Sequence, residues 1–307
     1  MAFKHKDLLS MRSLEPEEIE MILQTAASMR PLLDSRSKKT VHMQGKSIVT
    51  LFYENSTRTR TSFEMAGKYM GAATTNIAAS ASSVAKGETL IDTGRTLDRM
   101  GTDVIIIRHP MSGAPHLLAQ HVHAAVINAG DGVNEHPTQA LLDLFTMKQY
   151  KGKIEGLKVA IVGDILHSRV ARSNIFALNT MGAQVTLCAP PTLMPAQIEG
   201  LGVKAYTRIE EAIEGADVVM NLRIQKERQE EGNFPSLREY SAYFGLNERN
   251  IRYAKPDALI MHPGPVNRGV EIASEVADGA NSVINEQVTS GVAVRMALLY
   301  LLTRRGM

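Results

Sequence analysis

Short apolar runs recur along this chain, and most of them precede a stretch with helical periodicity. The runs are apolar at consecutive positions, which is typical of parallel strands covered by helices on both faces. The predicted strands lie at residues 47–53, 103–107, 124–128, 158–162, 184–188, 203–206, 217–222 and 258–261. The predicted helices lie at residues 59–70, 88–100, 138–148, 170–181 and 288–302.

A fresh series of strands and helices begins at Lys158, shortly after the break Lys151-Gly152-Lys153. This alternation predicts an α/β protein with two doubly wound domains, each with a central parallel sheet flanked by helices. The length of 307 residues is enough for two domains. We expect the first domain at residues 1–150, with a C-terminal helix at 286–307 packing back on it. The second domain is expected at residues 151–285.

The composition narrows the class of protein. With 44% hydrophobic and 21% charged residues, the chain resembles soluble globular proteins. The 34 Lys and Arg residues are balanced by 32 Asp and Glu residues, which leaves no basic surplus for nucleic acid. The single cysteine, Cys188, excludes an intrachain disulfide and fits a reducing compartment. Without an apolar N-terminal segment or a long apolar run, we expect a cytoplasmic protein that binds no membrane.

Polar clusters rich in arginine and histidine follow six of the predicted strands. Ligands of open α/β sheets bind beyond the carboxyl ends of the strands. Solvated surface loops would account for one such cluster but account poorly for all six, so the pattern indicates an anion-binding cleft. The clusters lie at residues 56–60, 108–110, 136–139, 163–169, 223 and 262–265.

The cluster Ser56-Thr57-Arg58-Thr59-Arg60 is typical of a phosphate site. Hydroxyl residues at a strand-to-helix turn cap the helix, and its first N–H groups favour an anion. Arg58 adds a planar group suited to bidentate phosphate contact. An ordinary capping segment with exposed arginines is the alternative interpretation.

Other familiar motifs are missing from the sequence. The stretch after residues 158–162 lacks the three-glycine dinucleotide fingerprint, and no segment has the spacing of a P-loop. The histidines show no metal-ligand spacing, so we expect neither a metal nor a cofactor. His136 stands out because it precedes a proline at a predicted helix start, where a neutral imidazole could polarise a carbonyl.

Taken in order, five segments resemble the carbamoyltransferases, and most closely the catalytic chains of aspartate carbamoyltransferases. They lie at residues 52–60, 86–89, 136–143, 223–228 and 262–269, so the resemblance covers essentially the whole chain. It implies transfer of the carbamoyl group from carbamoyl phosphate to the α-amino group of L-aspartate. The products would be N-carbamoyl-L-aspartate and phosphate, in the committed step of pyrimidine synthesis.

The resemblance also implies which residues bind carbamoyl phosphate. The catalytic residues would be Thr59, Arg108 and His136, because they would bind the carbonyl oxygen that becomes an oxyanion. Gln139 and the backbone carbonyls of the loop at residues 263–265 would receive the carbamoyl amino group. The complete implied set is Ser56, Thr57, Arg58, Thr59, Arg108, His136, Gln139, Pro263, Gly264 and Pro265.

For the acceptor, the resemblance implies that Arg169, Arg223 and Gln225 bind the aspartate carboxylates, together with Lys86. Ser82 and Lys86 would come from a neighbouring subunit, which makes the expected assembly a homotrimer with shared active sites. A regulatory chain or a dihydroorotase is a possible further partner.

Two features of the sequence bear on which amine accepts the carbamoyl group. Ornithine-specific relatives carry Cys where this chain has Pro263, and two arginines favour a dicarboxylate over a cationic amine. Gly264 departs from another branch of the aspartate family, which has Leu there. The alternatives are a carbamoyltransferase for another amine acceptor such as ornithine, and a catalytically silent assembly subunit. A silent relative usually lacks an arginine or the lysine, and this chain has all of them.

Overall fold

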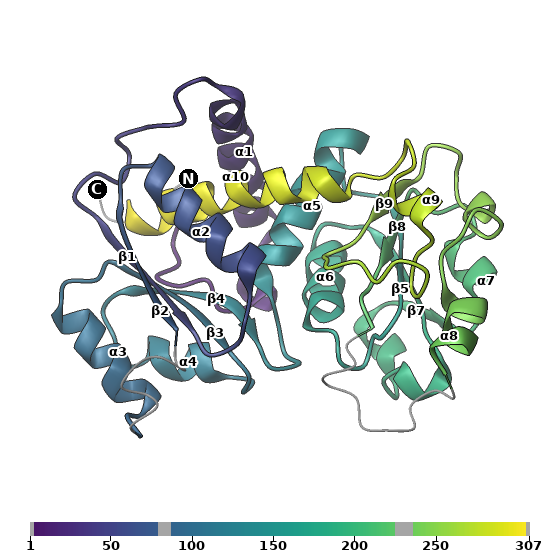
Figure 1. Cartoon of the computed structure of the whole chain (residues 1–307), viewed down its shortest axis with the longest axis horizontal. Coiled ribbons are helices and arrows are strands. Elements are labelled where there is room, and N and C mark those ends of the chain that lie inside the picture. Colours follow the sequence, from purple (N-terminus) through teal and green to yellow (C-terminus); the bar gives the residue numbers. More distant parts are fainter. Residues whose placement is uncertain (1–2, 79–86, 225–235, 305–307) are drawn as a thin grey trace. The chain divides into compact units, whose positions relative to one another are not determined.

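We describe residues 3–78, 87–224 and 236–304 of a computed structural model. The chain divides into two compact units (Figure 1). Unit 1 comprises Met1–Phe145 and Val288–Met307, and unit 2 comprises Thr146–Gln287. Each unit is built around one parallel sheet, so the predicted fold class is confirmed.

The sheet of unit 1 has the order β2-β1-β3-β4, and all neighbouring strands are parallel. After β1 the chain adds β2 on one side and then β3 and β4 on the other. The winding direction therefore reverses between β1 and β3, which is the topological switch point of a doubly wound sheet. The strands are β1 (Ser47–Phe52), β2 (Ala73–Ala78), β3 (Val104–His109) and β4 (Ala125–Asp131).

Helices cover both faces of this sheet, with α2 and α10 on one side and α3 and α4 on the other (Figure 1). On the second side, Leu97 of α3 and Leu118 of α4 pack in a buried cluster with Val49, Ile105 and Val126. The helices of unit 1 are α1 (Pro16–Met29), α2 (Thr57–Tyr69), α3 (Leu90–Arg99), α4 (Ala114–Ala119), the first part of α5 (Pro137–Lys151) and most of α10 (Ile284–Thr303).

On the other side, α2 lies very close to the sheet. A Cβ atom added at Gly67 would lie 2.7 Å from Thr74 Cγ2 of β2 and 3.0 Å from Ile48 Cδ1 of β1. Only a residue without a side chain fits between this helix and these strands. The last turns of α2 are thereby held against the first residues of β1 and β2.

Unit 2 repeats the doubly wound plan with five parallel strands in the order β7-β6-β5-β8-β9. Its winding reverses between β5 and β8. Ile213 of α7 packs with Ala160, Val219 and Ile260 of the sheet in one buried cluster. The elements are β5 (Lys158–Val162), α6 (Arg169–Thr180), β6 (Gln184–Cys188), β7 (Lys204–Tyr206), α7 (Ile209–Ile213), β8 (Val218–Asn221), α8 (Leu237–Phe244), β9 (Leu259–Met261) and α9 (Ser274–Ala277).

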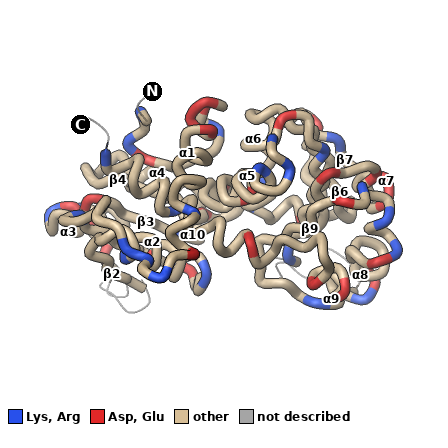
Figure 2. The backbone as a smooth tube through the Cα atoms, turned by 90° about the horizontal axis from the view of Figure 1, so that it is seen from above, with Lys and Arg blue, Asp and Glu red and all other residues tan. Residues whose placement is uncertain are grey.

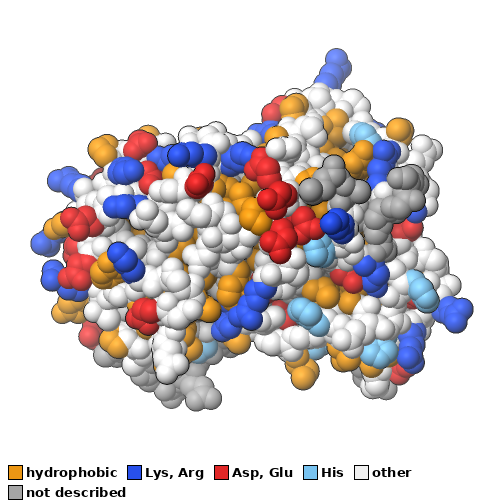
Figure 3. Space-filling model, turned by 180° about the vertical axis from the view of Figure 1, so that it is seen from behind, with side chains coloured by type: hydrophobic (Ala, Val, Ile, Leu, Met, Phe, Trp, Pro, Cys, Tyr) orange, Lys and Arg blue, Asp and Glu red, His pale blue; other side chains and the backbone are white. Residues whose placement is uncertain are grey.

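Charged residues of both signs are interspersed over the described parts of both units (Figure 2). The face drawn in Figure 3 likewise mixes acidic, basic and apolar side chains. Because neither sign dominates these two views, we expect an anionic ligand to depend on local clusters. Within the same residues, the helices include none long and apolar enough to cross a membrane.

Candidate active site in two parts

The switch point of unit 1 brings together the clusters that follow β1 and β3. Phe52 at the end of β1 pairs in register with Arg108 of β3, so the two strands end side by side. Arg108 Nε donates a hydrogen bond to Glu54 Oε2 at 3.0 Å. Their side chains are 16% and 20% exposed, which leaves this charge pair only partly screened by water.

The helix α2 begins where the sequence predicts an anion cradle, but two residues earlier than expected. Ser56 is the extended cap residue, although its side chain makes no capping hydrogen bond. Arg58 is exposed and Thr59 is buried in the first turn, which contains no acidic residue. Because the first N–H groups of a helix lack partners within it, this turn presents donors and a positive dipole end to an anion.

His136 is held by a polar network at the end of β4. This strand runs to Asp131, three residues beyond the predicted end. Asn128 Nδ2 donates to Asp131 Oδ1 at 2.8 Å, and that oxygen also accepts from Glu135 N at 3.1 Å. The His136 ring is 4% exposed, and its Nδ1 lies 3.4 Å from Thr138 Oγ1. The network fixes the turn that delivers His136 to the start of α5.

Gln139 lies in the first turn of α5, close to His136 along the helix. Its backbone N–H donates to His136 O at 2.9 Å. Its side-chain Nε2 donates to Asp143 Oδ1, one turn later, at 3.0 Å. The amide of Gln139 is therefore oriented by a buried carboxylate.

Unit 2 carries its arginines at the corresponding switch point. Val162 of β5 pairs with Asn221 of β8, and Arg223 follows two residues later. Arg169 begins α6, is 2% exposed, and follows the cap residue Ser168, whose hydroxyl accepts from Ala171 N at 3.1 Å. Both arginines thus follow strands that end side by side, as a ligand site at this edge requires.

Gly163 allows the close approach of these two strand ends. Its φ is +137°, and a Cβ there would lie 2.8 Å from Leu222 Cβ and 3.0 Å from Leu222 O. The next residue, Asp164, is fully buried and accepts from both His167 N, at 3.1 Å, and His167 Nδ1, at 3.0 Å. These contacts order the turn that leads to Arg169.

The loop after β9 is oriented by a buried histidine and glutamate. His262 Nδ1 accepts from Gly264 N at 2.8 Å, so its proton is on Nε2, which donates to Glu271 Oε1 at 3.2 Å. Both side chains of this pair are 0% exposed. Gly264 has a φ of +65°, a value that favours glycine. The pair holds the backbone that leads to Pro265.

Three predicted site residues, Ser82, Lys86 and Gln225, lie outside the described residues. The others occupy the carboxyl ends of the two sheets: residues 56–59, 108, 136 and 139 in unit 1, and residues 169, 223 and 263–265 in unit 2. Within the described ranges, no group of three or more His, Cys, Asp or Glu side chains could hold a metal. Burial raises the pKa of Cys188 to about 12, so this thiol is a poor nucleophile.

Sequence reasoning missed the acids that hold these groups in place, namely Glu54, Asp131, Asp143 and Glu271. Glu54 and Asp143 lie inside the segments that carry the resemblance, so their position was a usable signal. Asp131 follows a predicted strand after a glycine, a pattern that is typical of a turn and does not indicate a buried carboxylate. Glu271 lies nine residues after His262, and no local pattern marks it as buried.

Two family descriptions match the chain in succession. "Aspartate/ornithine carbamoyltransferase, carbamoyl-P binding domain" matches residues 6–149, and "Aspartate/ornithine carbamoyltransferase, Asp/Orn binding domain" matches residues 155–302. Both descriptions are of carbamoyltransferases, which are group-transfer enzymes. The chain belongs to the aspartate/ornithine carbamoyltransferase family.

Individual relatives are similar over nearly the full length. The aspartate carbamoyltransferase catalytic subunit of Ruminiclostridium cellulolyticum is 65% identical over 306 residues, covering 100% of this chain and 98% of the relative. Aspartate transcarbamoylase from Trypanosoma cruzi, solved with carbamoyl phosphate and aspartate, is 31% identical with a TM-score of 0.89 and 97% of each chain covered. Ornithine carbamoyltransferase from Pyrococcus furiosus is 30% identical with a TM-score of 0.87 and 98% of each chain covered. The backbone similarity alone does not distinguish the two acceptors, whereas the 65% identity favours aspartate.

Proposed function

We propose that this protein transfers the carbamoyl group of carbamoyl phosphate to the α-amino group of L-aspartate. The products are N-carbamoyl-L-aspartate and inorganic phosphate, as in the committed step of pyrimidine synthesis. The observation that carries the proposal is the placement of arginines at both switch points, with Arg58 and Arg108 in unit 1 and Arg169 and Arg223 in unit 2. The two substrates together carry about four negative charges, which these guanidinium groups match.

Unit 1 supplies the donor half of the proposed chemistry. The first turn of α2, with Ser56, Thr57, Arg58 and Thr59, binds the phosphate through N–H groups, hydroxyls and the helix dipole. Thr59, Arg108 and His136 donate to the carbonyl oxygen, and their bonds strengthen as it becomes an oxyanion. Gln139 accepts from the carbamoyl amino group. Because carbamoyl phosphate is already activated, the protein needs to orient it and stabilise the tetrahedral intermediate, without a covalent nucleophile.

Unit 2 supplies the acceptor half. Arg169 and Arg223 bind the two carboxylates of aspartate, with Gln225 and Lys86 assisting. This unit also contributes to donor binding, because the backbone carbonyls of Pro263, Gly264 and Pro265 accept from the carbamoyl amino group, and the His262–Glu271 pair orients this loop. An ornithine side chain would place an ammonium group beside the arginines, so this half disfavours the cationic acceptor.

The assembly proposed with this function is a homotrimer in which Ser82 and Lys86 reach the active site of a neighbouring subunit. A regulatory chain or a dihydroorotase is a further possible partner. The cytoplasmic location remains a prediction that rests on the composition of the sequence.

A product assay tests the function directly. The purified chain is incubated with carbamoyl phosphate and either L-aspartate or L-ornithine. We expect carbamoyl-aspartate and no citrulline. Citrulline as the only product would support carbamoyl phosphate as the donor and contradict aspartate as the acceptor. A folded trimer that forms neither product would support the silent assembly subunit.

Subunit complementation tests the shared site. Lys86→Ala and Arg58→Ala proteins, each inactive, are dissociated, mixed and reassembled. If Lys86 acts in a neighbour's site, mixed trimers contain some sites with both native residues, and activity returns. Confirmed mixing without any recovered activity would contradict the shared site.

A further inference from the structure

A buried series of contacts in unit 1 leads from Gln139 to the C-terminal helix. Gln139 Nε2 donates to Asp143 Oδ1 at 3.0 Å. Gln139 is 8% exposed and Asp143 is 0% exposed, so this bond is shielded from water. A hydrogen bond to a buried carboxylate is strong enough to fix the orientation of an amide.

Arg295 of α10 supplies a positive charge to this carboxylate. It is 4% exposed, and its guanidinium carbon lies 5.0 Å from the centre of the Phe63 ring of α2. A Cβ added at Gly291 would lie 2.6 Å from Arg295 Nη1, so the side chain folds back over a residue that must be small. Arg295 thus lies against helix α2, which carries the phosphate cradle, and acts electrostatically on α5 through Asp143.

The charge state of this cluster follows from burial. Burial lowers the pKa of Arg295 to about 10, while the Asp143 charge acts in the opposite direction. Arg295 therefore remains protonated at neutral pH and supplies a positive charge near the buried carboxyl group of Asp143. An ionised carboxylate can only accept hydrogen bonds. In the structure the amide nitrogen of Gln139 donates to Asp143, so its carbonyl oxygen faces away from this carboxyl group.

We propose that Asp143 is a positioning residue that makes Gln139 present its carbonyl oxygen to the substrate, so that the site selects a carbamoyl group over an acetyl group. This inference rests on the proposed function of unit 1. Carbamoyl phosphate offers an amino group to Gln139 Oε1, whereas acetyl phosphate places a methyl group of similar size there. A site built to hydrogen-bond an N–H rejects the analogue that lacks it, because a polar group is left unpaired.

The test compares two ligands in Asp143→Asn. An asparagine can donate to Gln139 Oε1, which turns the amide so that its NH₂ group faces the carbamoyl NH₂. We expect the KM for carbamoyl phosphate to rise about tenfold, which corresponds to the loss of the hydrogen bond between Gln139 and the carbamoyl amino group. The inhibition constants of acetyl phosphate and inorganic phosphate should stay within about twofold, because neither uses Gln139.

Further variants separate positioning from stability. The discrimination ratio is the inhibition constant of acetyl phosphate divided by the KM for carbamoyl phosphate. This ratio should fall in Gln139→Met as it does in Asp143→Asn. The double variant should show no further fall if Asp143 acts through Gln139. Should Asp143→Asn fail to fold because Arg295 loses its counter-charge, Asp143→Asn with Arg295→Gln removes both buried charges. Asp103→Asn is the matched control, because Asp103 bonds Lys46 at 2.8 Å at the amino edge of the same sheet.

The results distinguish this inference from the function itself. An unchanged ratio in Gln139→Met, or an equal weakening of both acyl phosphates in a folded Asp143 variant, would overturn the role of Asp143. A lower ratio in Asp103→Asn would overturn it as well, by showing a general effect of stability. Failure of the wild-type protein to form carbamoyl-aspartate would instead contradict the proposed function.

Discussion

Glu54 binds Arg108 across the switch point of unit 1, with 3.0 Å between Glu54 Oε2 and Arg108 Nε. Glu54 follows β1, and Arg108 is part of β3. These strands are neighbours in space, although the two residues lie some fifty residues apart in sequence. The hydrogen bond from Nε to this carboxylate restricts the rotation of the guanidinium group. Arg108 is thereby prepared to point its terminal nitrogens at one place, which lowers the cost of orienting it during the reaction.

Glu54→Gln should therefore reduce turnover more than substrate binding. The amide keeps the shape but loses the charge-assisted bond, so Arg108 becomes less ordered in its proposed role beside the oxyanion. We expect kcat to fall about tenfold and the KM for carbamoyl phosphate to change less than threefold. Steady-state kinetics at saturating aspartate measures both. Glu64→Gln, which alters an exposed pair with Lys68 on α2, should change neither, and an equal loss in both variants would contradict the role of Glu54.

Arg58→Ala should abolish phosphate binding without destabilising the fold. A basic residue in the first turn of a helix opposes the helix dipole, and Arg58 is exposed there. Without ligand, we expect the Tm to be unchanged or slightly higher. With carbamoyl phosphate, the Tm increase that we expect for the wild type should be absent in this variant, because binding to the native state is lost. Lys68→Ala in the last turn of α2 should keep the full increase.

The elements that position the site could be predicted because they are apolar and regular. Continuous apolar runs indicated all the sheet strands except β2 (Ala73–Ala78), and the polar clusters indicated which strand ends matter. The strand β2 is an edge strand with mostly exposed or half-exposed residues, so its sequence lacks an apolar run. The helix α1 was missed as well, although Glu15 and Glu18 form a capping box at its start. The shorter helices α4, α7, α8 and α9 were also not predicted.

The supporting acids could not be predicted in the same way. Asp143 and Glu271 look like surface carboxylates in the sequence, and they become informative only because both are fully buried in the folded chain. Arg295, the partner of Asp143, is far along the chain. His262, the partner of Glu271, is close in sequence, but no local pattern signals the pairing. Burial and pairing are properties of the tertiary structure, and apolar periodicity predicts them only for apolar residues.

Asp98 should make the stability of unit 1 depend on acidic pH. It accepts hydrogen bonds from Ala124 N at 2.8 Å, and from His123 N and His123 Nδ1, both at 2.9 Å. Burial is the largest single influence and opposes the shift, but these bonds together lower the pKa of Asp98. Its folded-state pKa lies below its unfolded value, so its contribution is present above that value, about 3.9, and is lost as pH falls.

We therefore expect Asp98→Asn to destabilise the protein by about 1–2 kcal/mol at pH 7, with a deficit that shrinks below pH 4. Urea unfolding at pH 7, 4 and 3 measures this. His123→Ala should cost much less, because the His123 side chain is fully exposed and exposed ion pairs contribute little. Asp34→Asn, which alters an exposed pair with Arg30, is the control. A deficit in Asp98→Asn that is constant with pH would contradict this account.

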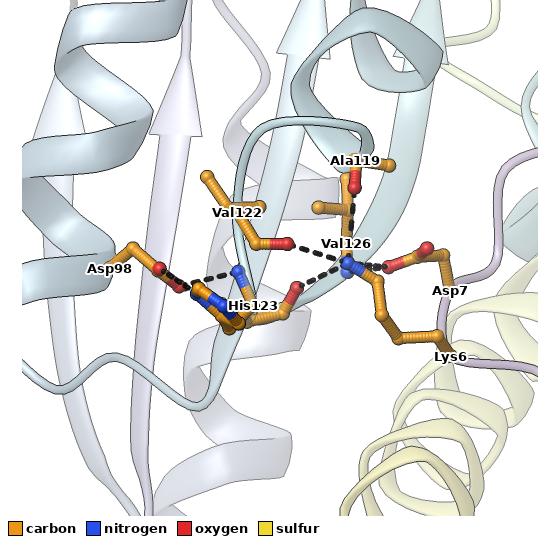
Figure 4. Close-up of polar contacts among 8 residues, drawn as sticks. Lys6, Asp7, Asp98, Ala119, Val122, His123 and Val126 are labelled. Carbon is orange, nitrogen blue, oxygen red and sulfur yellow. Dashed lines mark hydrogen bonds and ion pairs between the residues drawn. The ribbon is translucent and has the colours of Figure 1, made fainter.

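Lys6 should anchor the N-terminal segment to the turn between α4 and β4 (Figure 4). Its Nζ donates to three backbone carbonyls, at 3.1 Å to Ala119 O, 2.8 Å to Val122 O and 3.3 Å to Ala124 O. Asp7 Oδ1 lies 3.5 Å from the same nitrogen and also accepts from Val126 N. One ammonium group thus satisfies the carbonyls at the end of a short helix and at the entry to β4.

Replacing Lys6 by Met keeps most of the side-chain length but leaves these carbonyls without their charged donor. We expect a loss of about 2 kcal/mol, as for hydrogen bonds to a charged group, seen as a lower urea midpoint. Amide hydrogen exchange should accelerate in β4, which leads to His136, so local opening should increase there first. Lys4→Met, at an exposed position two residues earlier, should have little effect. Equal losses in the two variants would show that the charge near the N-terminus matters and the carbonyl contacts do not.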